Sequence, residues 1–176
     1  MNATISNLGN IFADDETSIK VNSTFMENSS LEVDWNFKVA DTTDQFIFKA
    51  DLGLLKAVHM NQFTKPNLNV DLNGELYQTY FTVSGNPETS RIDLKIKYDD
   101  FEVAILRSNG KEQNKFLSSI VNLFIAKDSE ENSKNFSYGQ VDEVNRDVNK
   151  SVFNFIWLNI KGGLLSAIAG DGKQED

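Results

Sequence analysis

The stretch Leu31-Glu32-Val33-Asp34-Trp35-Asn36-Phe37-Lys38-Val39 decides the fold class of this chain. Its apolar residues alternate with polar ones from end to end, without a break. Successive side chains of a β-strand point to opposite faces of the sheet, so the pattern predicts a strand with one buried face and one wet face. At ~3.3 Å per residue, this strand spans about 30 Å.

The same alternation recurs along most of the chain. Short polar turns, such as 41–44 and 85–87, separate the alternating segments, which predicts an antiparallel meander. Gly74 interrupts one segment and predicts a bulge or bend there. The apolar positions of these segments are Ile19, Val21 and Phe25; Phe46, Phe48, Ala50 and Leu52; Leu68, Val70, Leu72 and Leu76; Tyr77, Thr79, Phe81 and Val83; Ile92, Leu94, Ile96 and Tyr98; and Phe101, Val103 and Ile105.

A sheet with a single apolar face cannot stand alone in water, because that face must be covered or folded over. We therefore expect a mainly β (α+β) fold, in which the long meander curls into a groove or half-barrel. Residues 1–143 are expected to form this sheet domain, with a short helix after Leu52. The segment 115–126 fits a helix that runs into a strand.

The segment 144–169 differs from the rest, because its apolar residues spread around most of a helical projection. It predicts an amphipathic C-terminal helix that packs on the sheet or extends from it. Lys161-Gly162-Gly163 interrupts the apolar run, so we expect no membrane span here. Residues 170–176 are expected to be a disordered tail.

Composition limits the function classes open to this chain. Its 176 residues suit one domain, and a formal net charge of −9 argues against a nucleic-acid partner, which requires a basic surface. The absence of cysteine excludes disulfides, thiolate zinc sites and cysteine nucleophiles. Such a chain suits either a cytoplasm or a Gram-negative periplasm.

The sequence contains no recognisable catalytic pattern. His59 is the single histidine, and no nucleophile motif lies near it. Asp14-Asp15-Glu16 and Asp99-Asp100 could bind a cation only through carboxylates, and both fit turns better. A pair of carboxylates for glycoside cleavage stays open, because their separation exists only in three dimensions. We predict a protein that is not an enzyme, with no catalytic residue, no metal and no cofactor.

The positive signal is the shared apolar face, which has two interpretations. It could be an ordinary covered core, or it could form a groove for acyl chains, since burying 16 methylenes is worth on the order of 10 kcal/mol before losses. The residues predicted to face lipid are Leu31, Val33, Trp35, Phe37, Val39, Phe46, Phe48, Leu68, Val70 and Leu72. The residues of the C-terminal helix predicted to cover the sheet, or to contact a membrane or a partner, are Val152, Phe153, Phe155, Ile156, Trp157 and Ile160.

The order of several stretches resembles the C-terminal region of AsmA-like envelope proteins of the Bacteroidetes type. The resemblance spans about residues 51–164. It rests on Ala50-Asp51-Leu52-Gly53-Leu54-Leu55, Met60-Asn61-Gln62-Phe63-Thr64-Lys65-Pro66, Val70-Asp71-Leu72-Asn73-Gly74-Glu75-Leu76, Ile96-Lys97-Tyr98-Asp99-Asp100-Phe101-Glu102-Val103, Phe116-Leu117-Ser118-Ser119-Ile120-Val121-Asn122-Leu123-Phe124-Ile125, and Arg146-Asp147-Val148-Asn149-Lys150-Ser151-Val152-Phe153-Asn154-Phe155-Ile156-Trp157 followed by Gly162-Gly163-Leu164.

This resemblance implies a piece of a larger, membrane-anchored protein in the periplasm of a Gram-negative bacterium. It implies an open β-sheet groove that moves phospholipids between the inner and outer membranes or supports outer-membrane assembly. It brings no catalytic residues. The partners would be phospholipid or acyl chains, with an envelope protein as a further partner. The alternative is a protein-protein interaction module of the envelope whose core is filled by its own side chains.

Overall fold

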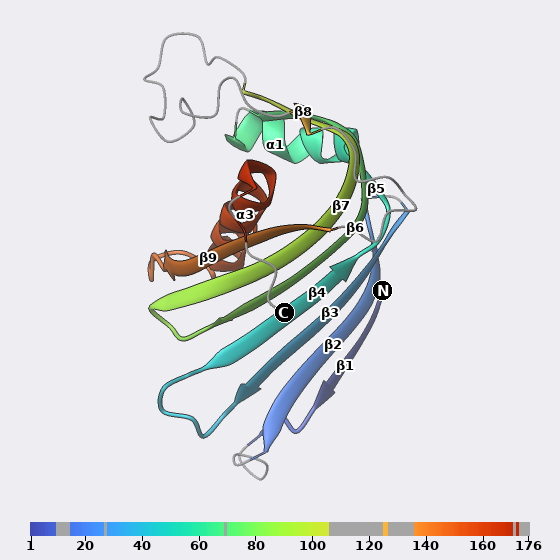
Figure 1. Ribbon diagram of the computed structural model, residues 1–176. Helices are drawn as coiled ribbons and strands as arrows, with labels where there is room; N and C mark the ends of the chain where they lie inside the picture. The colour runs from blue at the N-terminus through green and yellow to red at the C-terminus, as the bar shows by residue number, and fades with distance from the viewer. Residues whose placement is uncertain are drawn as a thin grey trace.

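The computed structural model describes residues 1–9, 15–26, 28–68, 70–105, 125–126, 136–170 and 172. Within them the chain forms one antiparallel sheet of nine strands, which confirms the mainly β prediction (Figure 1). The sheet is open and curved rather than closed. The strands are β1 (Asn2–Ser6), β2 (Glu16–Phe25), β3 (Ser29–Lys38), β4 (Phe46–Leu52), β5 (Leu55–Lys56), β6 (Val70–Gly85), β7 (Thr89–Ile105), β8 (Ile125–Ala126) and β9 (Ser137–Asn145).

Strand order follows chain order, as expected of a meander. β1 to β4 pair in sequence, β4 pairs with β6, and β6 pairs with β7. β9 then lies beside the first half of β7, while β8 pairs with its second half and β5 pairs with β6. β6 and β7 are the longest strands, with 16 and 17 residues, and together they form the centre of the fold.

Registers between the long strands place the alternating apolar residues on one side of the sheet. Residues directly opposite each other in an antiparallel pair share a face, so each pairing extends that face by one strand. We call this side the apolar face. Its members include Ile5, Ile19, Val21, Leu31, Val33, Trp35, Phe37, Phe46, Phe48, Ala50, Leu52, Phe81, Val83, Ile92, Leu94, Ile96 and Val141.

Two irregularities bend the long β6–β7 pair. The register shifts between Asn73 and Glu75 and again between Leu76 and Gln78. Gly74 has a φ of +91°, and a Cβ there would collide with the carbonyl of Asp100, so the predicted bulge is confirmed. At the bulge, the start of β6 and the end of β7 curve toward η2 and α1 at one end of the sheet (Figure 1).

Three helical segments accompany the sheet. The helix expected after Leu52 is a 3₁₀ turn, η2 (Ala57–Met60), that leads into α1 (Asn61–Leu68). The C-terminal helix α3 (Val152–Ala169) runs unbroken through Gly162 and Gly163. The predicted segment 115–124 lies outside the described residues, and of the expected tail only positions 170 and 172 are described.

The prediction that the C-terminal helix starts at residue 144 is wrong. Residues 144 and 145 belong to β9, and the helix begins eight residues later, at Val152. The reason is local: the Ser151 backbone is extended, and its side chain accepts a hydrogen bond from the Asn154 N–H at 3.3 Å, as an N-cap does. At the other end Gly170, with a φ of +73°, terminates the helix.

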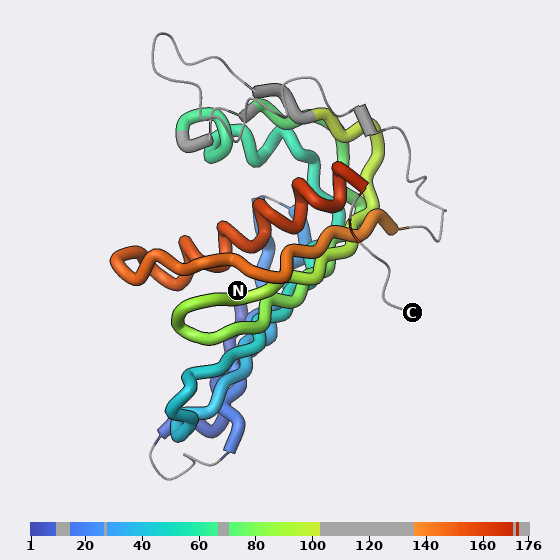
Figure 2. The backbone as a smooth tube through the Cα atoms, turned by 60° about the vertical axis from the view of Figure 1, so that its left-hand side comes forward, coloured from blue at the N-terminus to red at the C-terminus, as the bar shows by residue number. Residues whose placement is uncertain are grey.

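Helices α1 and α3 lie on the same side of the sheet, beside its β6, β7 and β9 part, while β1 to β3 extend past them (Figures 1 and 2). The approach of α3 to β9 is close enough to require glycine. A Cβ at Gly139 of β9 would collide with the carbonyl of Gly163 of α3, and a Cβ at Gly163 would meet Ile92 and Leu94 at 3.2–3.3 Å. Small residues on both elements thus set the distance between helix and sheet.

A buried polar pair fixes α3 in position along the sheet. Asn159 is fully buried, and its amide donates to the Ser90 hydroxyl of β7 at 2.8 Å and to the Phe155 carbonyl at 2.9 Å. The Ser166 hydroxyl, about two turns further along α3 than Asn159, accepts from the Gln140 N–H at 3.0 Å. Sliding α3 would leave these groups buried and unbonded, which is costly.

The core therefore lies under α3, η2 and α1 and does not extend across the whole apolar face. Val83, Ile92 and Ile96 are fully buried there. Val33, which has the same residue type and shares the same face on β3, is only half-buried and does not belong to the core cluster. The apolar face is thus divided into a covered part on β6, β7 and β9 and an open part on β1 to β3.

The glycine contact can be tested with Gly139→Ala. We expect it to lower the free energy of unfolding by about 1–3 kcal/mol, because the new methyl group forces α3 away from β9. Chemical denaturation followed by circular dichroism measures it. Gly162→Ala is the matched control, because its Cβ would meet only the Val141 side chain, at 3.1 Å, and alanine favours helix. Equal losses in both variants would contradict this account.

The division of the apolar face can be tested with one substitution at two positions. Val83→Ala should cost about 2 kcal/mol or more, because it leaves a cavity in a closed core. Val33→Ala should cost less than about 1 kcal/mol, because that side chain is only half-buried. Urea unfolding of both variants gives the comparison, and similar costs would mean that the β3 side of the face is core as well.

Candidate functional site

The open part of the apolar face carries a row of aromatic side chains. Trp35 lies 5.9 Å from Phe37 and 6.0 Å from Phe48 between ring centroids, and Phe48 stacks on Phe81 at 6.1 Å. The row therefore crosses from β3 through β4 to β6, from the open part of the face to the covered part. The register sets Trp35 opposite Phe48, Phe37 is two residues further along β3, and Phe81 is diagonal to Phe48 on β6.

Most residues predicted to face lipid do share the apolar face, but they divide between its two parts. Leu31, Val33, Trp35 and Phe37 lie half-buried on the open part. Phe46 and Phe48 are partly buried and pack against the core cluster, so they form the border between the two parts.

Leu72 has a different environment from its predicted neighbours. It is 8% exposed and belongs to the closed core beyond the bulges, where Asn61 of α1 donates to its carbonyl at 2.8 Å. The prediction that Leu72 lines an open groove is therefore wrong, since η2 and α1 cover this end of β6. The side chains of Leu68 and Val70 lie outside the described part of the chain.

Val39 does not belong to the strand that carries the apolar face, contrary to the prediction. β3 ends at Lys38, and Val39 lies 42% exposed in the turn that follows. The Asp41 N–H donates to the Lys38 carbonyl at 3.2 Å, and the Asp41 carboxylate accepts from the Thr43 hydroxyl at 2.7 Å. The bonds from Thr43 also hold the pKa of Asp41 below its usual value. The turn thus begins one residue before the alternation ends.

The residues predicted on the C-terminal helix divide into those that pack on the sheet and those that do not. Phe155 and Ile156 are buried against the sheet, and Ile160 packs on the core cluster, so α3 is a cover for β7 and β9. Phe155 reaches the ring of Phe46 at 6.3 Å. Val152 is half-buried, whereas Phe153 is 72% exposed and Trp157 turns toward α1. By length and composition α3 is the one helix of the described residues that could cross a membrane.

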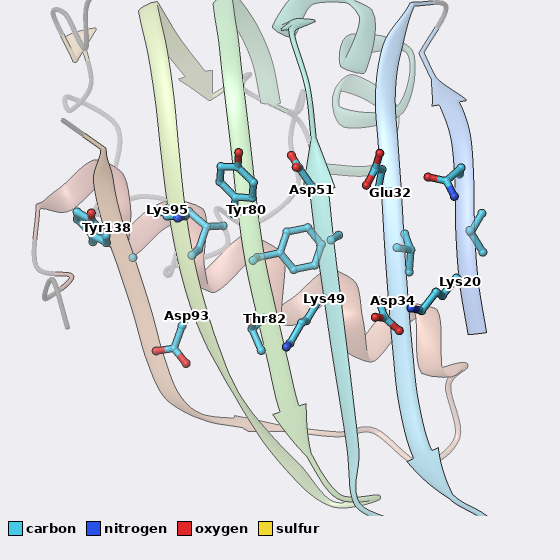
Figure 3. A pocket seen from close by; sticks show the side chains of 17 residues that line it. Lys20, Glu32, Asp34, Lys49, Asp51, Tyr80, Thr82, Asp93, Lys95 and Tyr138 are labelled. Carbon is cyan, nitrogen blue, oxygen red and sulfur yellow. The ribbon is translucent and has the colours of Figure 1, made fainter. Parts of the chain in front are cut away.

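The opposite side of the sheet is polar, and its side chains form rows across the strands. Lys20 lies opposite Asp34, and Asp34 lies opposite Lys49, so that unlike charges face each other over three strands. Such pairs stabilise the register that also defines the apolar face. Further along, the Lys95 ammonium lies 4.6 Å from the centroid of the Tyr80 ring (Figure 3).

A shallow hollow of about 550 Å³ lies on this polar side, not on the apolar face where the groove was predicted. Figure 3 shows the side chains that line it, and the charged ones among them come from β2, β3, β4 and β7. Burial raises the pKa of the Tyr80 phenol above 10.0, and the nearby charge of Asp51 raises it further.

Among the described residues, no group of three or more histidine, aspartate or glutamate side chains could hold a metal ion. His59 lies half-buried in η2, and Asp99 accepts a hydrogen bond from the Tyr77 hydroxyl at 3.2 Å on the bent part of β7. Neither arrangement places a nucleophile beside a base. What the described residues offer a ligand on the apolar face is apolar surface.

Sequence reasoning missed two features that position this face. Gly139 and Gly163 are far apart in sequence, and no spacing rule could have paired them. Phe63 of α1 was quoted only as part of a resemblance, yet its ring packs edge-to-face on Trp157 at 5.4 Å between centroids. One signal in the sequence could have linked Phe63 with Trp157: the segments around both residues lack acidic side chains.

Comparison with protein-family models, with curated proteins and with solved structures finds no match for this chain.

Proposed function

We propose that this chain is a non-catalytic domain of the Gram-negative cell envelope that handles lipid, with acyl chains held on the open part of its apolar face. The observation that carries the proposal is the shared face itself: registers from β1 to β9 bring the alternating side chains to one side, and the described helices cover only part of it. Contiguous exposed apolar surface is typical of sites for lipid or protein partners.

The dimensions of the open part suit a hydrocarbon chain. β2 and β3 have 10 residues each, so this surface is about 33 Å long. Each methylene that leaves water for such a surface contributes ~0.8 kcal/mol. The aromatic row of Phe37, Trp35, Phe48 and Phe81 supplies broad apolar contacts, and its single polar group, the indole N–H of Trp35, is buried without a hydrogen-bond partner.

The resemblance to AsmA-like proteins supports the same proposal. On this proposal the chain belongs to a larger, membrane-anchored periplasmic protein that transports phospholipid between the two membranes or supports outer-membrane assembly. Lipid would partition onto the face and move along it, and no covalent chemistry would be required. The domain would have phospholipid as its ligand and no cofactor.

A second candidate function is a protein-interaction module, and the edge strand β1 favours it. The sequence of β1, Asn2-Ala3-Thr4-Ile5-Ser6, contains no charge and no proline, and all its residues are exposed. Edge strands that lack such protection readily pair with another strand. On this alternative a strand of an envelope protein would pair with β1, and the apolar face would continue onto that added strand.

The lipid proposal can be tested through Trp35, which reports directly on the open part of the face. In a Trp157→Phe background Trp35 is the single tryptophan, and phospholipid with brominated acyl chains should quench its fluorescence. Val33→Asn should weaken this binding by about tenfold or more, because it buries an amide against hydrocarbon. The measurement is a fluorescence titration, together with native mass spectrometry of the protein purified from a Gram-negative host.

Asp34→Asn is the matched control, because it places the same residue one position further along β3, on the polar side. It should bind lipid as the parent does, since Asn can still accept the hydrogen bond that Ser18 donates to Asp34 at 3.2 Å. The proposal fails if native mass spectrometry shows no bound lipid and Trp35 is not quenched. A lipid-free protein that captures strand peptides at β1 would favour the second function.

A further inference from the structure

Helices α1 and α3 each carry an exposed aromatic side chain, and an edge-to-face ring contact joins the two helices. Phe153 is 72% exposed in the first turn of α3, and Trp157 lies one turn further on the same side of the helix. Trp157 contacts Phe63, which is 42% exposed on α1. Phe153, Trp157 and Phe63 thus form a continuous row, which we call the aromatic ridge, and Val58 of η2 adds a further exposed apolar side chain (54%).

The charge around the aromatic ridge differs from that of the rest of the chain. The protein has 26 acidic residues and a formal net charge of −9, yet residues 53–68 and 148–170 contain no aspartate or glutamate. The same two segments contain four lysines, Lys56, Lys65, Lys150 and Lys161. One of them, Lys65, pairs with Asp71 at 2.8 Å, while Lys56 and Lys150 are exposed.

We infer that the aromatic ridge docks this protein on the surface of an anionic lipid bilayer. Phe153, Trp157 and Phe63 would enter the interfacial region, where aromatic side chains are favoured, and the lysines would lie among the headgroups. Charge complementarity argues for a bilayer: segments 53–68 and 148–170, which carry lysine and no acidic residue on an otherwise acidic protein, match the negative potential of anionic lipid.

The packing of α3 determines how it can meet the membrane. Phe155, Ile156 and Asn159 are buried against the sheet, and Asn159 is bonded to Ser90. Crossing the bilayer would require all of these contacts to break, so the helix lies on the membrane with its outward side. Docking of this kind depends on the ridge and not on the open apolar face, and it would serve the proposed lipid handling by bringing that face to a membrane.

The test uses the other tryptophan. In a Trp35→Phe variant Trp157 is the single reporter, and its emission should shift to the blue when vesicles of phosphatidylglycerol and phosphatidylcholine are added. Brominated lipids should quench it from shallow positions near the headgroups. Vesicles of phosphatidylcholine alone, or added salt, should weaken binding, since the attraction is partly electrostatic.

The decisive variant is Phe153→Ser combined with Phe63→Ser. It should lower the vesicle partition coefficient by at least about tenfold, because two aromatic side chains no longer leave water. Val39→Ser is the matched control: Val39 is 42% exposed, as Phe63 is, but it lies in the β3–β4 turn away from the ridge. Circular dichroism confirms that each variant is folded.

The two proposals fail separately in these experiments. Vesicles that leave the Trp157 emission unchanged, or a double variant that binds as well as Val39→Ser, would overturn membrane docking. Quenching of Trp35 by bound lipid would still support the open face as a lipid site. Conversely, Trp157 could respond to vesicles while Trp35 never meets an acyl chain, in which case the domain docks on membranes without carrying lipid.

Discussion

The register of the β-strands is the constraint on which the rest of this structure depends. A shift of one residue in any pairing would turn every side chain of that strand to the other side. The observed registers, Ile19 with Trp35, Trp35 with Phe48, Phe48 with Val83 and Val83 with Ile92, place the apolar residues on one side across five strands. On the polar side of the sheet, rows of opposite charges such as Lys20, Asp34 and Lys49 also disfavour a shift in register. Both faces therefore specify one alignment.

Helix α3 converts this uniform face into two unequal parts. It can approach β9 closely only where Gly139 and Gly163 meet, and it is fixed along the sheet by the bonds of Asn159 and Ser166. Because those positions lie over β7 and β9, the helix covers Val83, Ile92 and Leu94 and stops short of Val33. The open part of the face is thus a consequence of where two glycines and one asparagine stand in the sequence.

The sequence was sufficient to predict what depends on local pattern. Alternation identified the strands, and Gly74 marked the bulge, because both signals arise from backbone geometry within a few residues. The errors came partly from tertiary context and partly from local turn and cap signals within apolar patterns. Leu72 carries the same pattern as Val33, yet α1 covers it, and Val39 continues the alternation of β3 although the bonds of Asp41 begin the turn. The start of α3 depended on Ser151 as a cap, a signal that was available in the sequence but lay within an apolar run that looked helical from residue 144.

The aromatic ridge and the open face raise a common physical question, namely why an acidic protein leaves these two apolar surfaces outside its core. Exposed apolar area of this kind promotes aggregation unless charge or a partner opposes it. On the β-sheet, the charged side chains lie on the opposite side of the same strands, so each strand carries both an apolar and a charged face. On α1 and α3, by contrast, the local charge is positive and the aromatics stand among lysines. The net charge of −9 makes two molecules of this protein repel each other, and this repulsion is weakest at the ridge, where the acidic residues are missing from the sequence. Segments that carry lysine and no acidic residue attract an anionic partner, and for that reason we propose the membrane for the ridge and the acyl chain for the open face.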